Sequence, residues 1–131
     1  NKRLVDSIVY VDQIDPSTLP TDLRFFPGNT DFTGALNNPQ AWVHNTQKMT
    51  LFVNNTTDKS IGMQIITATG VGGNAAYAIA EPLTSIPANT KKRYTSEDFP
   101  IFAEPFARLV IMINRKEVTT GNLTIIAEVA R

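Results

Sequence analysis

Apolar and polar residues alternate along several short stretches of this chain, and the alternation predicts β-strands. In the stretch 106–114 every second residue is aliphatic, namely Ala107, Leu109, Ile111 and Ile113. Successive side chains of a strand point to opposite faces, so these four would share one face. A wholly apolar face is typical of the inner wall of a sheet.

The same criterion, or an apolar run bounded by turn residues, predicts further strands at 4–11, 42–43, 49–53, 61–69, 92–95 and 122–129. The polar links 54–59 and 115–121 are rich in turn-forming residues. We therefore expect 49–53 and 61–69 to form a hairpin. In the same way, 106–114 and 122–129 would pair antiparallel, with their aliphatic sides closing the interior. No helix of three turns is expected.

Residues 12–40 break this pattern. They contain four prolines, Pro16, Pro20, Pro27 and Pro39. Proline fixes φ and removes a backbone donor, so this segment cannot form a central strand. A fully exposed loop would rarely carry the three phenylalanines Phe25, Phe26 and Phe32. We expect a long loop that these rings attach either to the core or to a partner.

The resulting fold prediction is an all-β, antiparallel β-sandwich that resembles a jelly roll. Short strands separated by proline- and glycine-marked turns are typical of such folds. A chain of 131 residues can support one core without covalent cross-links. We therefore expect residues 1–131 to form a single domain, with 12–40 as a long N-terminal loop excursion within it.

The composition excludes several kinds of partner and chemistry. Twelve Lys and Arg residues balance twelve Asp and Glu residues, so no overall field attracts nucleic acid or an anionic membrane. No apolar run approaches the roughly 20 residues of a membrane-spanning helix. The chain has no cysteine, which excludes disulfides and zinc sites with cysteine ligands. The cluster Lys91, Lys92 and Arg93 is interpreted as a solvated turn or strand edge, and on an edge lysine opposes unwanted strand addition.

The sequence offers little material for catalysis. His44 is the single histidine, and no Gly-x-Ser-x-Gly motif is present, so His44 is interpreted as a structural or surface histidine. Asp12 and Asp15 flank a strand exit and are interpreted as turn formers, with half of a calcium site as the alternative. The glycine-rich stretch 70–74 lacks the Lys-Ser/Thr of a phosphate-binding loop. We expect no enzyme activity, no metal and no cofactor.

Protein–protein contacts are a better prospect. The first strand has apolar residues on both faces, and Val5, Val9 and Val11 are its candidate contact residues. We expect this strand to pair within its own domain, with the sheet edge of a neighbouring subunit as the alternative. The predicted interface consists of these three valines together with Phe25, Phe26 and Phe32.

Glycan contacts are a separate prospect. Trp42 and Tyr77 are the candidate residues, because aromatic rings can stack on sugars. Asn54, Asn55 and Asn122 each begin an Asn-x-Thr triplet, which is a glycosylation acceptor only in a eukaryotic secreted protein.

Three segments carry a resemblance: 85–91, 106–113 and 119–124. Together they resemble the C-terminal half of small β-sandwich modules found in decoration and fibre proteins of phage virions and in bacterial surface appendages. The resemblance covers about a third of the chain. It implies a non-enzymatic assembly or decoration subunit, often homo-oligomeric, on a virion or an extracellular surface. It identifies no catalytic residues.

Our leading hypothesis is therefore a structural interaction module of a virion or extracellular surface assembly. It would act by burying apolar area against other protein subunits, including copies of itself. The alternative is a carbohydrate-binding module that uses Trp42 and Tyr77. A hydrolase with a scattered pair of carboxylates is the third and least favoured hypothesis.

Overall fold

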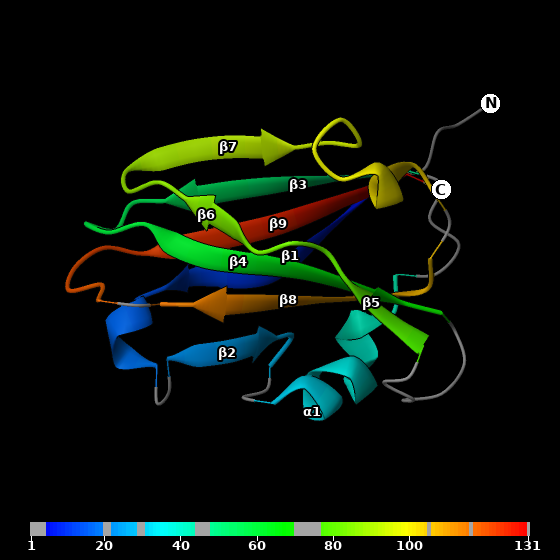
Figure 1. Cartoon of the computed structure of the whole chain (residues 1–131), viewed down its shortest axis with the longest axis horizontal. Helices are drawn as coiled ribbons and strands as arrows, with labels where there is room; N and C mark the ends of the chain where they lie inside the picture. The colour runs from blue at the N-terminus through cyan, green and yellow to red at the C-terminus, as the bar shows by residue number, and fades with distance from the viewer. Residues whose placement is uncertain are drawn as a thin grey trace.

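The computed structural model describes residues 5–19, 22–28, 31–43, 48–69, 77–104, 106–115 and 117–130. In this part the chain forms two packed antiparallel sheets with one α-helix on the outside (Figure 1). The strands are β1 (Val5–Ile14), β2 (Leu23–Phe26), β3 (Lys48–Asn55), β4 (Ile61–Ala68), β5 (Ala78–Ala80), β6 (Thr84–Ile86), β7 (Thr90–Tyr94), β8 (Arg108–Asn114) and β9 (Leu123–Ala130). The helical elements are α1 (Phe32–Asn37) and the 3-10 turns η1 (Pro16–Thr18), η2 (Pro39–Ala41) and η4 (Pro100–Ala103).

The strand order confirms the predicted β-sandwich. The first sheet has the order β1-β9-β3-β7, and the second has the order β2-β8-β4-β5, with β6 also paired to β4. From β1 to β4, and again from β6 to β9, each strand lies in the sheet opposite to the strand before it. This repeated crossing between two sheets is the arrangement of a jelly roll.

Both predicted hairpins are wrong. β3 pairs with β7 and β9, whereas β4 pairs with β5, β6 and β8. Likewise, β9 pairs with β1 and β3, and β8 pairs with β2 and β4. Consecutive strands therefore face each other across the core, where each buries its aliphatic face against the other's. The links that join them, 56–60 and 117–122, cross between the sheets and are termed the arches.

The core lies between the sheets and consists mainly of the predicted inner faces. Most of its fully buried aliphatic side chains come from β3, β4, β8 and β9, among them Leu51, Val53, Ile61, Ile65, Leu109, Ile111, Ile113 and Ile125. Full burial of such a side chain contributes about 1.5–3 kcal/mol relative to exposure. The aliphatic side chains that the alternation identified thus contribute much of the stability of the sandwich through their burial.

Segment 12–40 is more structured than the predicted loop. β1 continues to Ile14, and β2 pairs with β8 at the edge of its sheet, where proline-flanked strands are tolerated. Short helical elements follow side-chain caps. The Asp15 carboxylate accepts from the Ser17 N–H at 3.0 Å, and the Asp31 carboxylate accepts from the Gly34 N–H at 2.7 Å. The first N–H groups of a helix have no carbonyl partner within the helix, and a capping side-chain oxygen accepts their hydrogen bonds instead. Such caps allow even a single turn to form.

Helix α1 covers the outer face of the second sheet. A second cluster of buried side chains forms there: Ala35, Leu36, Ala41, Ile66, Ala68, Val110 and Met112. Phe25 and Phe32 pack against this cluster, with ring centroids 6.0 Å apart. Strand β8 is therefore apolar on its inner face and covered on its outer one, which explains the mixed second face of 106–114.

The two arches are bonded to each other. The Asp58 carboxylate of the first arch accepts from the N–H of Thr119 at 3.0 Å, from the N–H of Thr120 at 3.2 Å and from the Thr119 hydroxyl. Gly121 in the second arch has a φ of +96°, and a Cβ there would lie 2.4 Å from the Thr56 carbonyl oxygen. Only glycine permits this approach, because it has no Cβ and accepts a positive φ.

Below the arches, Asn55 is fully buried at the end of β3. Its carboxamide nitrogen donates to the carbonyls of Lys59, Ile86 and Pro87 at 3.0–3.3 Å. Its carboxamide oxygen accepts from the N–H of Thr57 at 2.9 Å and from the Thr57 hydroxyl at 2.6 Å. Asn55 thereby ties the first arch to the β6–β7 turn.

Candidate interaction surface

The sandwich has two open sides, where its edge strands lie. The side with β7, β5 and β6 is termed the β7 side, and the side with β1 and β2 is termed the β1 side. In Figure 1, β7 runs along the top of the molecule and β2 runs along the bottom. All five large hydrophobic side chains that are exposed in the described residues come from these edge strands or from the link beside them: Val9, Leu23, Tyr77, Ile79 and Leu83.

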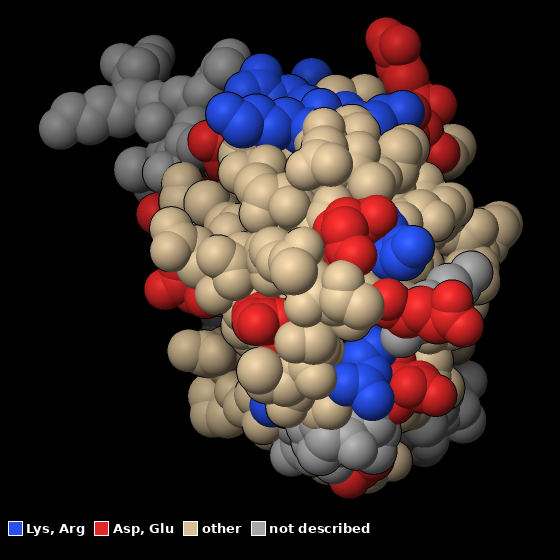
Figure 2. All heavy atoms as spheres, turned by 90° about the vertical axis from the view of Figure 1, so that its left-hand side faces the viewer, with Lys and Arg blue, Asp and Glu red and all other residues tan. Residues whose placement is uncertain are grey.

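The β7 side is positively charged along β7. Lys91, Lys92 and Arg93 are all exposed, and Figure 2 shows Lys and Arg side chains gathered along the top of the molecule over this strand. The Lys92 ammonium lies 5.1 Å from the centre of the Tyr94 ring. Burial, and secondarily the negative charge of Asp98, raise the pKa of the Tyr94 hydroxyl. The interpretation of this cluster as a charged strand edge agrees with its position at the edge of the first sheet.

The same side also exposes apolar side chains along the edge of the second sheet. Tyr77 is 52% exposed, Ile79 is 62% exposed and Leu83 is 54% exposed. β5 has only three residues and pairs with β4 alone. A short edge strand limits uncontrolled strand addition, yet these side chains remain available to a partner.

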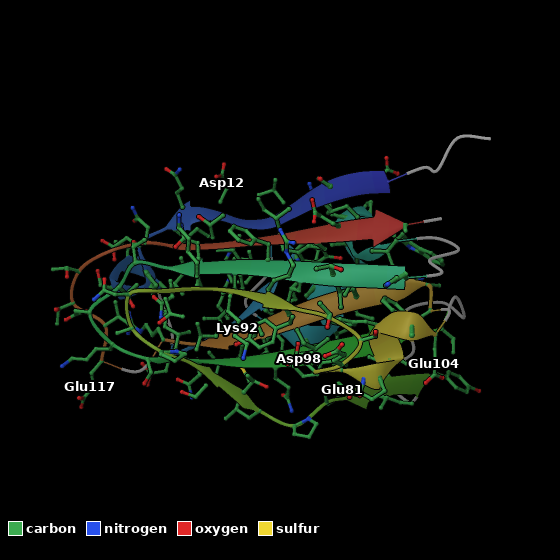
Figure 3. All side chains as sticks on the ribbon, turned by 90° about the horizontal axis from the view of Figure 1, so that it is seen from above. Asp12, Glu81, Lys92, Asp98, Glu104 and Glu117 are labelled. Carbon is green, nitrogen blue, oxygen red and sulfur yellow. The ribbon has the colours of Figure 1, made fainter. Side chains whose placement is uncertain are left out.

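The β1 side differs in charge. Val9 is 50% exposed on β1 and Leu23 is 44% exposed on β2. Asp6 and Asp12 are exposed on β1, and Figure 3 shows Asp12 at the outer margin of the sandwich, away from Lys92. The β1 edge therefore carries acidic side chains, whereas the β7 edge carries basic ones.

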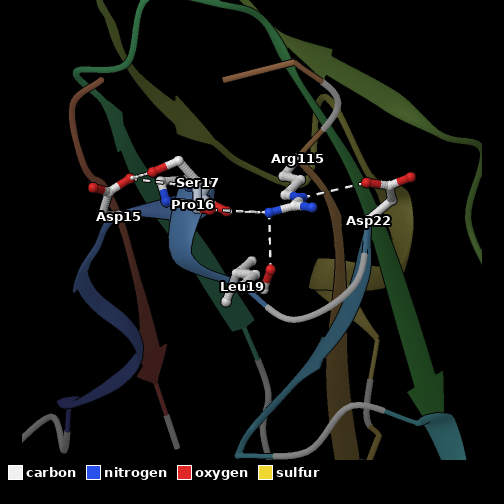
Figure 4. Close-up of polar contacts among 6 residues, drawn as sticks. All are labelled: Asp15, Pro16, Ser17, Leu19, Asp22 and Arg115. Carbon is white, nitrogen blue, oxygen red and sulfur yellow. Dashed lines mark hydrogen bonds and ion pairs between the residues drawn. The ribbon is translucent and has the colours of Figure 1, made fainter. Parts of the chain in front are cut away.

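Arg115 fixes the link between β1 and β2. Its guanidinium donates to the carbonyls of Leu19 at 2.8 Å, Ser17 at 3.1 Å and Pro16 at 3.4 Å. It also forms an ion pair of 3.3 Å with Asp22, which Figure 4 shows on the other side of the guanidinium. One arginine thus holds the η1 turn against the start of β2, which gives the β1 side a fixed shape.

The predicted interface residues lie in different places. Val9 is exposed, but Val11 and Phe26 are buried in the main core. Phe25 of β2 and Phe32, the first residue of α1, are half-buried and pack against each other. The backbone of Val5 belongs to β1, and its side chain lies outside the described part.

Pairing of β1 follows the expectation for a strand within its own domain. β1 pairs with β9 of the same chain. The phenylalanines attach segment 12–40 to the molecule's own core, and Val9 is the predicted contact residue that offers an exposed side chain. The sequence did not identify Leu23, Ile79 or Leu83, because short apolar segments do not reveal which edge their strands will occupy.

The predicted glycan residues occupy one end of the second sheet. The Arg108 guanidinium lies 4.0 Å from the centre of the Trp42 ring and donates to the Leu36 carbonyl at 2.8 Å. Arg108 is only 5% exposed, and its Nε has no hydrogen-bond partner among the described residues. One face of Trp42 is therefore occupied by a cation, while Tyr77 is exposed. Sugar stacking by these two rings stays a prediction.

In the described part of the chain, the remaining residues considered for catalysis or metal binding do not form a cluster. Asp15 caps η1 through Ser17, as expected of a turn former. In the ranges that the structure describes, no group of three or more His, Asp or Glu side chains could hold a metal ion. His44 and residues 70–74 lie outside those ranges. Among the described helices, none is long and apolar enough to cross a membrane.

Comparison of the chain with models of protein families, with characterised proteins and with solved structures finds no match.

Proposed function

We propose that this protein is a non-enzymatic structural module, a subunit or decoration protein of a virion or extracellular surface assembly, that associates with further copies of itself. The observation that carries the proposal is the complementary charge of β7 and β1, the two edge strands of the first sheet. The β7 edge is basic, with Lys91, Lys92 and Arg93, and the β1 edge is acidic, with Asp6 and Asp12.

Both sides also expose apolar side chains, so contact between them would bury apolar area as well as pair charges. Tyr77 and Ile79 belong to the β7 side, whereas Val9 and Leu23 belong to the β1 side. Apolar burial contributes roughly 25 cal/mol per Å², and a specific interface requires about 1,000 Å² or more. The charges would set orientation and association rate more than affinity.

The proposed contact joins two different surfaces of the same molecule. Such a heterologous contact leaves one basic and one acidic side unused at the ends of every chain of subunits. Repetition produces a ring where the rotation closes and a filament where it does not. This outcome suits the surface assemblies that the sequence resembles.

A charge exchange tests the proposal. We expect wild-type protein to associate with rising concentration in size-exclusion chromatography with light scattering, and more weakly at high salt. The variant Lys91→Glu/Lys92→Glu/Arg93→Glu has two acidic sides, and the variant Asp6→Lys/Asp12→Lys has two basic sides. Each variant alone is expected to be monomeric, whereas an equal mixture of the two is expected to associate again.

The control exchanges charges away from both sides. Lys59 and Glu117 are exposed on or beside the arches, and Lys59→Glu/Glu117→Lys should associate like the wild type. A wild-type protein that stays monomeric at millimolar concentration contradicts the proposal. So does a mixture of the two charge-reversed variants that shows no association.

A further inference from the structure

A polar hollow lies on the outer face of the first sheet. Its volume is about 210 Å³, and it is lined by Gln13, Asn54, Thr56, Asn122 and Thr124. Gln13 comes from β1, Asn54 from the end of β3 and Thr124 from the start of β9, whereas Thr56 and Asn122 are the arch residues next to those two strands. All five side chains are neutral, and all five carry hydrogen-bonding groups.

Four of these residues form a symmetric arrangement. Asn54 and Thr56 are two positions apart, as are Asn122 and Thr124, so each pair projects from one face. β3 and β9 run antiparallel, and Asn54 lies opposite Thr124 in the register. Thr56 lies opposite Asn122: the Thr56 N–H donates to the Asn122 carbonyl at 2.9 Å, and the Asn122 N–H donates to the Thr56 hydroxyl oxygen at 2.9 Å.

This pairing gives a structural meaning to two of the three Asn-x-Thr triplets. Each triplet places a carboxamide and a hydroxyl on the outer face, and the antiparallel register sets each carboxamide beside the hydroxyl of the other strand. The third triplet begins at Asn55, which points into the core and is fully buried.

A backbone irregularity adds the fifth residue. The pairing of β1 with β9 shifts between Val11 and Ile14. Gln13 lies within this shift, has a φ of +47°, and donates its N–H to the Thr124 hydroxyl oxygen at 3.2 Å. A bulge of this kind redirects a side chain that regular pairing would send elsewhere. Here the irregularity coincides with the edge of the hollow.

The three carboxamides have no hydrogen-bond partner among the residues that the structure describes. In the described part of the chain, the side chains of Gln13, Asn54 and Asn122 neither donate to nor accept from another residue. Their neighbour Asn55, in contrast, has every polar atom bonded. Three unpaired carboxamides around one neutral hollow are equipped to bind a ligand.

We infer that this hollow binds a neutral saccharide, at the level of a single sugar ring. A carboxamide presents a donor and an acceptor in one plane, and neighbouring sugar hydroxyls can satisfy both. None of the five lining side chains is charged, and Lys91, opposite Asn54 on β7, lies outside the lining, so an ionic ligand would lose hydration without a charged partner in the lining itself. An apolar ligand would leave the carboxamides unsatisfied. The lining contains no aromatic ring for stacking, so the dissociation constant is expected to be on the order of 1 mM. This site is separate from Trp42 and Tyr77, and it does not depend on self-association.

The side-chain amide resonances of Gln13, Asn54 and Asn122 provide the test. ¹⁵N-labelled full-length protein is titrated with methyl glycosides of glucose, galactose, mannose and N-acetylglucosamine, and with short linear oligosaccharides of the same sugars. We expect saturable shifts of these amide signals with at least one neutral sugar. Binding of the oligosaccharide alone would identify a glycan chain as the source, and binding of both would identify a single ring.

The double variant Asn54→Ala/Asn122→Ala is expected to weaken binding at least tenfold. Ser7→Ala, on an exposed residue of β1, is the matched control and should bind like the wild type. The backbone spectrum reports folding of each variant, and Asn122→Asp, which keeps the shape but loses the donor, serves as a second variant. Three results would overturn the inference: no shift with any neutral sugar, unchanged binding by both asparagine variants, or stronger, salt-sensitive binding of glucuronic acid.

Discussion

Asn54 and Asn55 are consecutive residues of β3, and they belong to two regions that use the same side chain differently. Asn55 points inward, is fully buried and bonds to Lys59, Ile86, Pro87 and Thr57. Asn54 points outward into the polar hollow, where its carboxamide has no partner in the described part of the chain. The strand's two-residue period separates a structural asparagine from one that is free to bind. Residue type alone would not distinguish them.

The arch region should be the most sensitive to substitution, and Gly121→Ala is the strongest test. A Cβ at Gly121 would meet the Thr56 carbonyl oxygen at 2.4 Å, and its φ of +96° is unfavourable for alanine. We expect a loss of at least about 3 kcal/mol in the free energy of unfolding, measured by urea denaturation.

Gly28→Ala is the matched control for Gly121→Ala. Gly28 also has a positive φ, +63°, but its Cβ would meet only the end of the Asn38 side chain, at 3.1 Å. The expected loss is about 1 kcal/mol, the cost of a left-handed conformation alone. Equal losses for the two variants would show that the arches are not tightly joined.

The two asparagines provide the next test. Asn55→Ala removes a buried carboxamide and leaves the Thr57 N–H and several carbonyls without their hydrogen-bond partner. We therefore expect a loss of about 2–3 kcal/mol in the free energy of unfolding. Asn54→Ala removes an outward side chain that the fold does not use, so its effect should stay within about 0.5 kcal/mol. Denaturation curves of the two variants measured side by side decide the comparison. A large effect of Asn54→Ala would assign that residue to the fold rather than to the hollow.

Asp58 should give a modest effect on stability that depends on pH. The Thr119 hydroxyl, the Thr119 N–H and the Thr120 N–H lower the pKa of this carboxylate from its usual 3.8 to about 2. The ionised form is thus favoured by folding, so its contribution is complete above the unfolded pKa and is lost as pH falls through 3.8 towards 2.

Asp58→Asn should therefore lower the melting temperature by a few degrees at about pH 5, with little difference from the wild type near pH 2. Circular dichroism melts across this range measure both. If the difference between the two proteins does not shrink on acidification, the charge of Asp58 does not contribute to joining the arches.

The sequence predicted the layers better than their connections. Alternation in 106–114 and 122–129 correctly identified two strands and their inner faces. It could not show which sheet each strand joins, because a hairpin and an arch both follow an apolar run with a polar link. Helix α1 was missed because it has only six residues, and burial of Ala35 and Leu36 against the outer face of the second sheet, rather than propensity, stabilises it.

Predicting the candidate sites required even more knowledge of pairing between distant segments than predicting the strand connections did. Val9 was predicted as a contact residue and is exposed, but Phe26 and Val11 turned out to complete the core. The hollow requires β9 to lie between β1 and β3, which no local pattern encodes. The repeated Asn-x-Thr triplet was visible in the sequence, but its meaning required the register that sets Asn54 opposite Thr124.

The position of β9 also has a consequence for biosynthesis. Of the nine strands described, β9 leaves the ribosome after the other eight, yet it pairs with β1 on one side and β3 on the other. Until β9 emerges, β1 and β3 lack the strand that pairs with both of them. Their aliphatic faces then stay exposed to solvent or are covered by chaperones. Folding of this domain is thus expected to be a late, slow event, completed only after translation has passed its final strand.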